Sequence, residues 1–165
     1  MATSLPFYSQ YLDIKNPDWQ GKACGVASLA MLLGAKAPSL DELYQLGLDR
    51  KAYLPGVGWR HAGLASLAKH FGFKNSYNLD LAKEDMESAL AKLKAELKNG
   101  PVMVSVFARY EHGHKEGHLV VLLSLNDKEA EVLDPNVLDK KQGLQLIPAA
   151  KFIAGWKKRL IVVRL

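Results

Sequence analysis

The stretch that most constrains the fold is KACGVASLAMLLG at residues 22–34, which holds the only cysteine of the chain, Cys24. Residues 26–33 contain no helix breaker, and Gly34 suits the position that closes a helix. The apolar run is too short to cross a membrane, which takes about 20 residues. The stretch therefore predicts a buried helix with Cys24 at or just before its N-terminus.

A cysteine in this position can be reactive or can simply fill space. The unpaired N–H groups and the positive dipole end of a helix favour a thiolate, the nucleophilic form of cysteine. Free cysteine is also among the most buried residue types, so a purely structural role is the alternative. Because a single cysteine cannot form an internal disulfide, the fold must rest on its core and the thiol of Cys24 stays free to react.

Length and composition predict a single globular domain. The chain has 165 residues, enough to bury a core, and its hydrophobic share of 48% and charged share of 24% are near the globular averages. The net charge of +5 comes from dispersed lysines. Because no arginine-rich stripe with interleaved aromatics is present, we expect no nucleic-acid partner and only a mild preference for anionic partners.

The start of the chain shows no targeting signal. Residues 1–4 lack the charged segment and the apolar run of a signal peptide, and no apolar run is long enough for a membrane span. As written, the chain is expected to be cytoplasmic. It would be exported if it is a mature fragment whose export signal was replaced by a starting methionine.

Helical patterns dominate the first hundred residues. Ser39 begins a capping box after a proline, which predicts a helix at 39–47, and a second apolar spacing predicts a helix at 61–72. Asp80 is expected to cap a long helix that the Asn-Gly-Pro sequence at 99–101 stops. Between these helices, residues 48–60 are expected to form a long surface loop of the kind that often lines a site.

The second half of the chain is rich in strand patterns. Strands are predicted at 102–107, 119–123, 129–133, 144–147 and 159–163, with a short helix near 148–154. Helices followed by mostly antiparallel strands predict an α+β fold. We expect one domain over residues 1–165, with an N-terminal helical lobe at about 1–100 packed on a C-terminal sheet lobe at about 101–165.

An activated cysteine needs a base to take its proton and a third group to orient that base. Among the five histidines, His118 stands apart because it opens a predicted strand, and Asp134 ends the next one. Two antiparallel strands joined by a turn place the start of one beside the end of the other. A contact between His118 and Asp134 is therefore expected, although a solvated histidine and a turn-forming aspartate would fit the same pattern.

An ordered set of short motifs carries a resemblance to a known family. The motifs are YSQ at 8–10, Trp19, CG at 24–25 with SLAM at 28–31, GWRH at 58–61, GHLVV at 117–121 and VLDP at 132–135. Together they resemble the bacteriocin-processing (double-glycine leader) peptidase family, and more narrowly its stand-alone, transporter-free branch among the papain-like cysteine peptidases. The likeness covers residues 5–135.

The resemblance implies a papain-like fold and a cysteine peptidase that cleaves a peptide or a peptide-like amide, with no cofactor. Cys24 matches the nucleophile of the family, and His118 matches the general base that later acts as an acid. Asp134 matches the residue that orients the imidazole. Gln10 matches the glutamine of the oxyanion hole, whose amide would donate to the tetrahedral intermediate.

Several alternatives stay open at this point. Gln20 is nearer to the cysteine in sequence and is the rival of Gln10. The side chains of Tyr53, Trp59 and His61 could line the substrate cleft, although the tryptophan could equally pack under its loop.

The class of reaction is open as well. The same residues could transfer the acyl group to an acceptor other than water, or the fold could serve as a catalytically silent peptide-binding module. His112, His114 and His118 could instead bind zinc, but the neighbouring glycines and the lack of a further ligand favour no metal.

Overall fold

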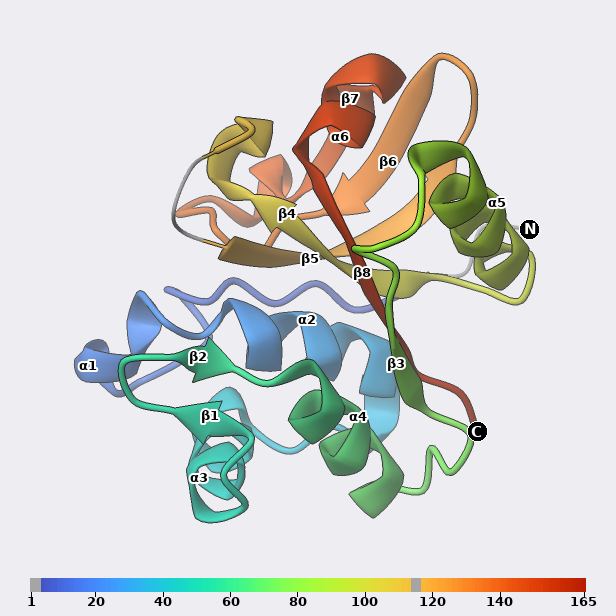
Figure 1. Cartoon of the computed structure of the whole chain (residues 1–165). Coiled ribbons are helices and arrows are strands. Elements are labelled where there is room, and N and C mark those ends of the chain that lie inside the picture. The colour runs from blue at the N-terminus through green and yellow to red at the C-terminus, as the bar shows by residue number, and fades with distance from the viewer. Residues whose placement is uncertain (1–3, 114–116) are drawn as a thin grey trace.

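A six-stranded antiparallel sheet divides the molecule into two layers of helices (Figure 1). The computed structural model describes residues 4–113 and 117–165. The strand order in the sheet is β3-β8-β4-β5-β6-β7. These strands are β3 (Tyr77–Asp80), β4 (Val102–Phe107), β5 (Gly117–Leu125), β6 (Glu129–Leu133), β7 (Leu144–Pro148) and β8 (Trp156–Val162). The mixed α+β fold expected from the sequence is present.

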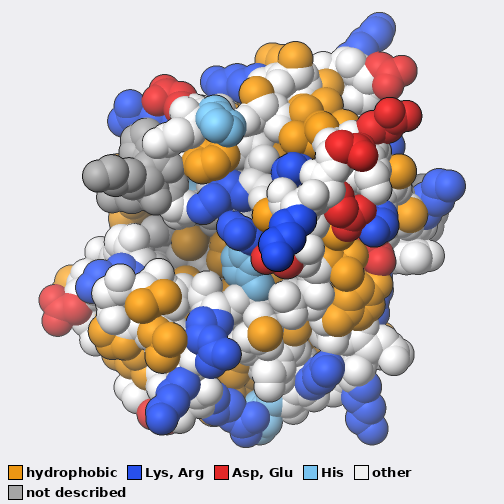
Figure 2. Space-filling view, viewed as in Figure 1, with side chains coloured by type: hydrophobic (Ala, Val, Ile, Leu, Met, Phe, Trp, Pro, Cys, Tyr) orange, Lys and Arg blue, Asp and Glu red, His pale blue; other side chains and the backbone are white. Residues whose placement is uncertain are grey.

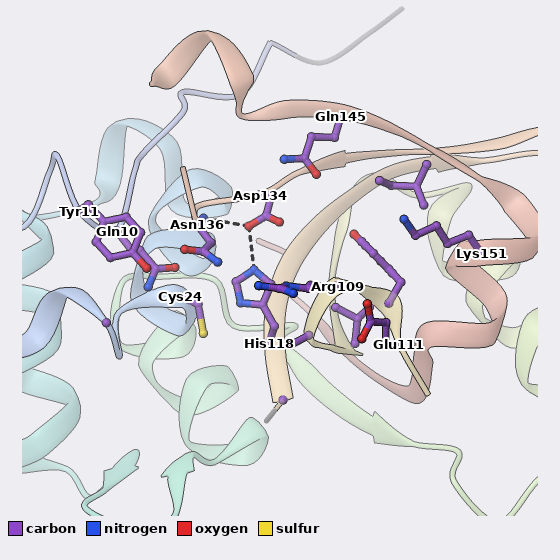
Figure 3. Close-up of a pocket in the computed structure, with 16 residues that line it drawn as sticks. Gln10, Tyr11, Cys24, Arg109, Glu111, His118, Asp134, Asn136, Gln145 and Lys151 are labelled. Carbon is purple, nitrogen blue, oxygen red and sulfur yellow. Dashed lines mark hydrogen bonds and ion pairs between the residues drawn. The ribbon is translucent and has the colours of Figure 1, made fainter. Parts of the chain in front are cut away.

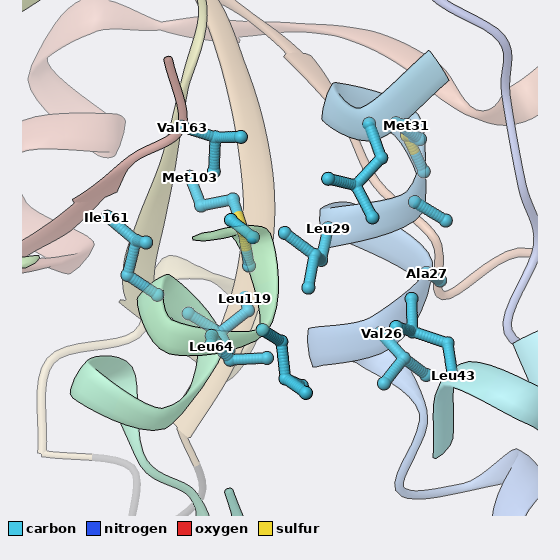
Figure 4. Close-up of a cluster of buried hydrophobic side chains, with 14 of the residues drawn as sticks. Val26, Ala27, Leu29, Met31, Leu43, Leu64, Met103, Leu119, Ile161 and Val163 are labelled. Atoms are coloured by element: carbon cyan, nitrogen blue, oxygen red, sulfur yellow. The ribbon is translucent and has the colours of Figure 1, made fainter. Parts of the chain in front are cut away.

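One face of the sheet packs against the helix that begins with the cysteine. This helix, α2 (Cys24–Leu33), has residues 25–31 and Leu33 buried. Helices α3 (Leu40–Asp49) and α4 (His61–His70) complete the layer, as Figure 4 shows for the side chains between α2 and the strands. Burying one large aliphatic side chain contributes about 1.5–3 kcal/mol, so this cluster fixes α2 against the sheet.

The other face of the sheet packs against α5 (Met86–Leu97) and α6 (Ala149–Gly155). Strand β4 is buried on both faces because its valines point to this second cluster whereas Met103 points to the first. This explains its continuous apolar sequence, which does not alternate with polar residues.

The division of the chain between the two lobes differs from the sequence expectation. Residues up to about 100 were expected in the helical lobe, but β3 pairs with β8 and α5 packs against the second cluster of the sheet. The apolar stripe of α5 predicts that the helix is packed but does not say on which face of the sheet. β3, which precedes α5, pairs with β8 from the far end of the chain, and this pairing places α5 on the second face of the sheet.

The cap expected at Asp80 is wrong. Asp80 is the last residue of β3, and α5 begins after Asp85, whose carboxylate accepts the N–H of Ser88 at 2.8 Å. Both aspartates can accept local N–H groups, and Asp80 uses this capacity in a turn with the N–H of Ala82 at 3.1 Å. By contrast, the cap expected at Ser39 is present, because its hydroxyl accepts the N–H of Glu42 at 3.2 Å.

Two connecting segments lie close to the site described below. The loop expected at 48–60 contains a small hairpin of β1 (Tyr53–Leu54) and β2 (Gly58–Trp59). Residues 4–16 run along the seam between α2 and the sheet before the short helix α1 (Pro17–Gln20), as Figure 1 shows. No helix within the described ranges is both long and apolar enough to span a membrane.

Candidate active site

Cys24 is the first residue of α2, as the sequence predicts. The preceding residue, Ala23, is the N-cap and offers no side-chain oxygen to the free N–H groups of the first turn. The positive end of the helix dipole and these N–H groups therefore act on the thiol of Cys24. The side chain is partly exposed, so a reactant can reach it.

Gly25 is required because an indole ring lies directly on it. A Cβ atom at Gly25 would lie 2.6 Å from Cγ of Trp59, which is closer than atoms can approach. The indole N–H of Trp59 donates to the carbonyl of Lys22 at 2.7 Å. Trp59 thus covers the first turn of α2 and anchors the loop that leads into Cys24.

The pair expected from the hairpin is present. His118 is the second residue of β5, Asp134 directly follows β6, and the imidazole Nε2 lies 2.7 Å from the carboxylate Oδ1 of Asp134 (Figure 3). Oδ1 also accepts the N–H of Asn136 at 2.8 Å, which holds the carboxylate in place. Because Nε2 faces Asp134, the other ring nitrogen, Nδ1, is the one left to face Cys24.

The surroundings of His118 favour its charged form. Burial of the ring lowers the pKa of His118, but hydrogen bonds to Asp134 and to the Cys24 thiol, with the negative charges of both, outweigh burial and raise the pKa to about 10. An imidazolium held between a carboxylate and a sulfur atom stabilises a thiolate. This arrangement can support nucleophilic attack by sulfur and later proton donation by the ring.

The two glutamines of the N-terminal segment have different surroundings. Gln10 is 3% exposed and its side-chain amide donates to the carbonyl of Gln20 at 2.8 Å, while its Oε1 has no partner among the described residues. The amide of Gln20 donates to two loop carbonyls, those of Tyr11 and Ile14, both at 3.2 Å. Gln20 therefore holds the loop together, whereas Gln10 lies beside Cys24 in the cavity shown in Figure 3.

Two cavities meet at Cys24 and His118. The first, of about 770 Å³, contains Gln10 and Asp134, and the second, of about 370 Å³, lies on the side of the β1–β2 hairpin. Both are lined by Gly21, Cys24, Gly117 and His118. An elongated molecule could therefore occupy both cavities at once and lie across the thiol of Cys24.

The three residues expected along the cleft all line the second cavity. Tyr53, Trp59 and His61 come from the β1–β2 hairpin and from the start of α4. Trp59 also packs inside an aromatic cluster, with its ring 4.9 Å from that of Tyr53 and 5.2 Å from that of Tyr44. Packing under the loop and lining the cavity are thus compatible for this residue.

The residues of the zinc alternative are only partly described. His112 packs against the ring of Phe107 with centroids 5.0 Å apart, and His118 is engaged with Asp134. His114 lies outside the described residues. Within the described ranges, no group of three or more histidine, cysteine, aspartate or glutamate side chains is placed to hold a metal ion.

Other residues of the first cavity have no signal in the sequence. Arg109 and Tyr110 follow β4 with φ of 58° and 60°, a left-handed conformation that non-glycine residues rarely adopt. They and Lys151 line the cavity opposite Gln10. Nothing in the side chains predicts two consecutive left-handed residues, so sequence reasoning had no means of placing them.

Comparison with known proteins identifies the family and the fold of this chain. Residues 3–160 match the sequence pattern of the Peptidase C39 like family. The chain belongs to this family. It is therefore a C39-like member of the cysteine peptidases, and no curated protein sequence matches it significantly.

Solved structures similar to this C39-like chain share its fold. A C39-like peptidase from Bacillus anthracis has a TM-score of 0.65 and 20% identity over 98% of this chain and 95% of that one. A double glycine motif protease from an AMS/PCAT transporter, in complex with the leader peptide, has a TM-score of 0.58 and 22% identity over 96% and 90%. The peptidase domain of Streptococcus ComA, a bifunctional ABC transporter of a quorum sensing pathway, has a TM-score of 0.59 and 18% identity over 88% and 93%.

Proposed function

We propose that this C39-like chain cleaves a peptide through a covalent acyl-enzyme on Cys24. In this proposal His118 is the general base and acid, Asp134 orients the imidazole, and Gln10 stabilises the oxyanion. The observation that carries the proposal is the imidazole of His118, which lies 2.7 Å from the carboxylate of Asp134 and lines, together with Cys24, the place where the two cavities meet.

Acylation follows from the positions of these groups. The thiolate of Cys24 attacks the carbonyl carbon of the scissile peptide, and the carbonyl oxygen becomes an oxyanion. When the C–N bond breaks, the imidazolium of His118 gives its Nδ1 proton to the leaving amine. The negative charge of Asp134 on Nε2 keeps the ring in the orientation that this transfer requires.

Deacylation uses the same groups in reverse. The neutral imidazole takes a proton from a water molecule, whose oxygen attacks the thioester carbon, and the second tetrahedral intermediate collapses with loss of the Cys24 thiolate. The products are the free carboxylic acid of one fragment and the amine of the other.

The oxyanion hole is assigned to the backbone N–H of Cys24 and the side-chain amide of Gln10. A primary amide has two N–H bonds, and the carbonyl of Gln20 occupies one of them. The second stays available to an oxygen beside Cys24. The assignment to Gln10 is further supported by its position in the cavity, because the amide of Gln20 is held by two loop carbonyls.

The proposed substrate is an extended peptide that occupies both cavities. One structural neighbour is in complex with a leader peptide, which supports a peptide as the substrate class here. Transfer of the acyl group to an added amine, in place of water, would be revealed by the mass of the product.

Trapping of the intermediate tests the proposal. The protein is incubated with a synthetic peptide library, quenched in acid and weighed by intact-mass spectrometry. The wild type should gain the mass of an acyl fragment, and Cys24→Ala should gain none. Iodoacetamide should alkylate Cys24 rapidly at pH 6 in the wild type and markedly more slowly in His118→Ala. A chain that forms no adduct and whose thiol reacts like free cysteine would contradict the proposal.

A further inference from the structure

The described lining of the second cavity includes two lysines and no carboxylate. Lys22 enters it from the loop before α2 and Lys157 from β8 on the opposite wall, and none of its described lining residues is an aspartate or a glutamate. Figure 2 shows lysine and arginine side chains gathered across the middle of this face. An uncompensated cation in a cleft attracts an anionic group of the substrate.

Lys157 reaches the cavity from an irregular part of β8. Ser105 of β4 pairs with Arg159, whereas the next residue, Val106, pairs with Trp156, so Lys157 and Lys158 form a bulge between these pairs. Lys158 has φ of 55°, which costs a non-glycine residue roughly 1–2 kcal/mol. Bulges of this kind often lie next to active sites, where they redirect a side chain.

The bulge is held in place by contacts on its other side. The ammonium group of Lys158 donates to the carbonyl of Glu84 at 2.6 Å, and the N–H of Leu81 donates to the carbonyl of Lys158 at 2.8 Å. Lys157 is thereby left to lie over the start of β5, with Nζ 3.2 Å from the position that a Cβ of Gly117 would take. Lys157, Gly117, Cys24 and His118 all line the second cavity, so this ammonium group borders the same cavity as the reacting groups.

Lys157 is held in its position without a described anionic partner. Its Nζ lies 5.2 Å from the centre of the Phe107 ring, and no carboxylate of residues 4–113 or 117–165 forms an ion pair with it. Partial burial, together with the charge of Arg159, lowers the pKa of Lys157. The carboxylate of Asp80 lies 3.3 Å from Nε of Arg159 and is thus paired with that side chain.

We infer that the second cavity is a carboxylate-binding subsite, in which Lys157 and Lys22 receive an acidic group of the peptide that Cys24 cleaves. The inference rests on the proposed function and specifies its substrate class. The carboxylate could come from an aspartate or glutamate side chain or from the C-terminus of the substrate, because both have the same chemistry.

Defined peptide pools test the subsite. Two pools are randomised except for a central glutamate or a central glutamine, and both have amidated C-termini. Wild-type protein should cleave the glutamate pool with a kcat/KM at least about tenfold higher, since the pools differ only in the charged hydrogen-bond acceptor. A third pool contains no internal acidic residue and is tested with a free and with an amidated C-terminus. Faster cleavage of the form with the free C-terminus would identify the terminal carboxylate as the group that binds.

Substitutions at the bulge identify the cation. Lys157→Met should reduce the difference between the pools, with Lys22 remaining, and Lys157→Glu should reverse the preference toward a pool with a central lysine. Lys94→Met makes the same change of net charge at an exposed position on α5, which packs on the opposite face of the sheet, and should keep the wild-type preference. Equal cleavage of all pools by the wild type would overturn the inference.

Binding separates failure of the subsite from failure of the proposed function. Fluorescein-labelled pools are titrated with Cys24→Ala and followed by fluorescence anisotropy, a readout that needs no turnover. Cys24→Ala should bind the acidic pool more tightly than the neutral pool, and the double variant with Lys157→Met should bind the acidic pool more weakly. This result would support the subsite even if the wild type cleaves nothing. Equal binding of acidic and neutral pools would refute it even if Cys24 proves to be the nucleophile.

Discussion

The hydroxyl of Ser28 on α2 donates to the backbone carbonyl of Leu119 on β5 at 3.2 Å. Ser28 is fully buried and lies one helical turn after Cys24, while Leu119 directly follows His118. This single hydrogen bond therefore joins the helix of the proposed nucleophile to the strand of the proposed base. It adds a directional contact to the apolar packing that holds α2 against the sheet.

Removal of this link is expected to affect both stability and turnover. Ser28→Ala leaves a buried carbonyl without its donor, which should destabilise the fold by about 1–3 kcal/mol in urea denaturation. It should also lower kcat more than it raises KM, because the thiol and the imidazole are then positioned less precisely. Ser124→Ala, at an exposed position of β5, should change stability by less than about 0.5 kcal/mol. Equal effects of the two substitutions would contradict the positioning role of Ser28.

The pH profile should report the charge on His118. Because its folded-state pKa of about 10 lies above the usual value of about 6.5, protonated His118 contributes stability that is complete below pH 6.5 and is lost as the pH rises through about 10. The same loss of the imidazolium removes the proton donor, so kcat should fall over this range. Asp134→Asn should move this high-pH fall in kcat, the falling limb of the profile, to lower pH, because it removes the negative charge beside Nε2.

The control for this pH experiment is Asp127→Asn, in the exposed turn before β6, which should leave the falling limb where it is. A limb near pH 6.5 in the wild type, or one that Asp134→Asn does not move, would show that Asp134 does not act on His118 in this way.

The two glutamines should separate catalysis from stability. Gln10→Ala should lower kcat by roughly a hundredfold or more, about 2.7–4 kcal/mol, with little change in KM, because the amide acts on charge that develops in the transition state. Gln20→Ala should instead lower the melting temperature, since its amide holds the carbonyls of Tyr11 and Ile14. A crippling loss of kcat in Gln20→Ala alone would exchange the two roles.

Gly25 should tolerate no side chain while Trp59 is present. Gly25→Ala is expected to cost about 1–3 kcal/mol, because its Cβ would lie 2.6 Å from the indole ring. Adding Trp59→Ala should relieve this cost, so the two changes should be non-additive in a double-mutant cycle. Gly21→Ala is the matched control: no atom lies within 4 Å of its Cβ, and its φ of −71° suits alanine. A similar loss of stability at both glycines would contradict the packing argument.

Features set by short segments of the chain could be predicted from the sequence. The helix that starts at Cys24, the cap at Ser39 and the strand at 102–107 depend on local periodicity and capping. The contact of His118 with Asp134 was also expected, because a hairpin brings its own strand ends together. Each of these follows from residues that are near one another in the chain.

The tertiary structure alone decided where distant segments meet. The face of the sheet that α5 covers depends on the pairing of β3 with β8, and the distinct surroundings of Gln10 and Gln20 depend on how residues 4–16 lie along the seam. Left-handed backbone at Arg109 and Lys158 is imposed by neighbouring elements, against the preference of the residues themselves. Local sequence cannot encode these features, because their stabilising contacts come from side chains that only the packed fold brings together.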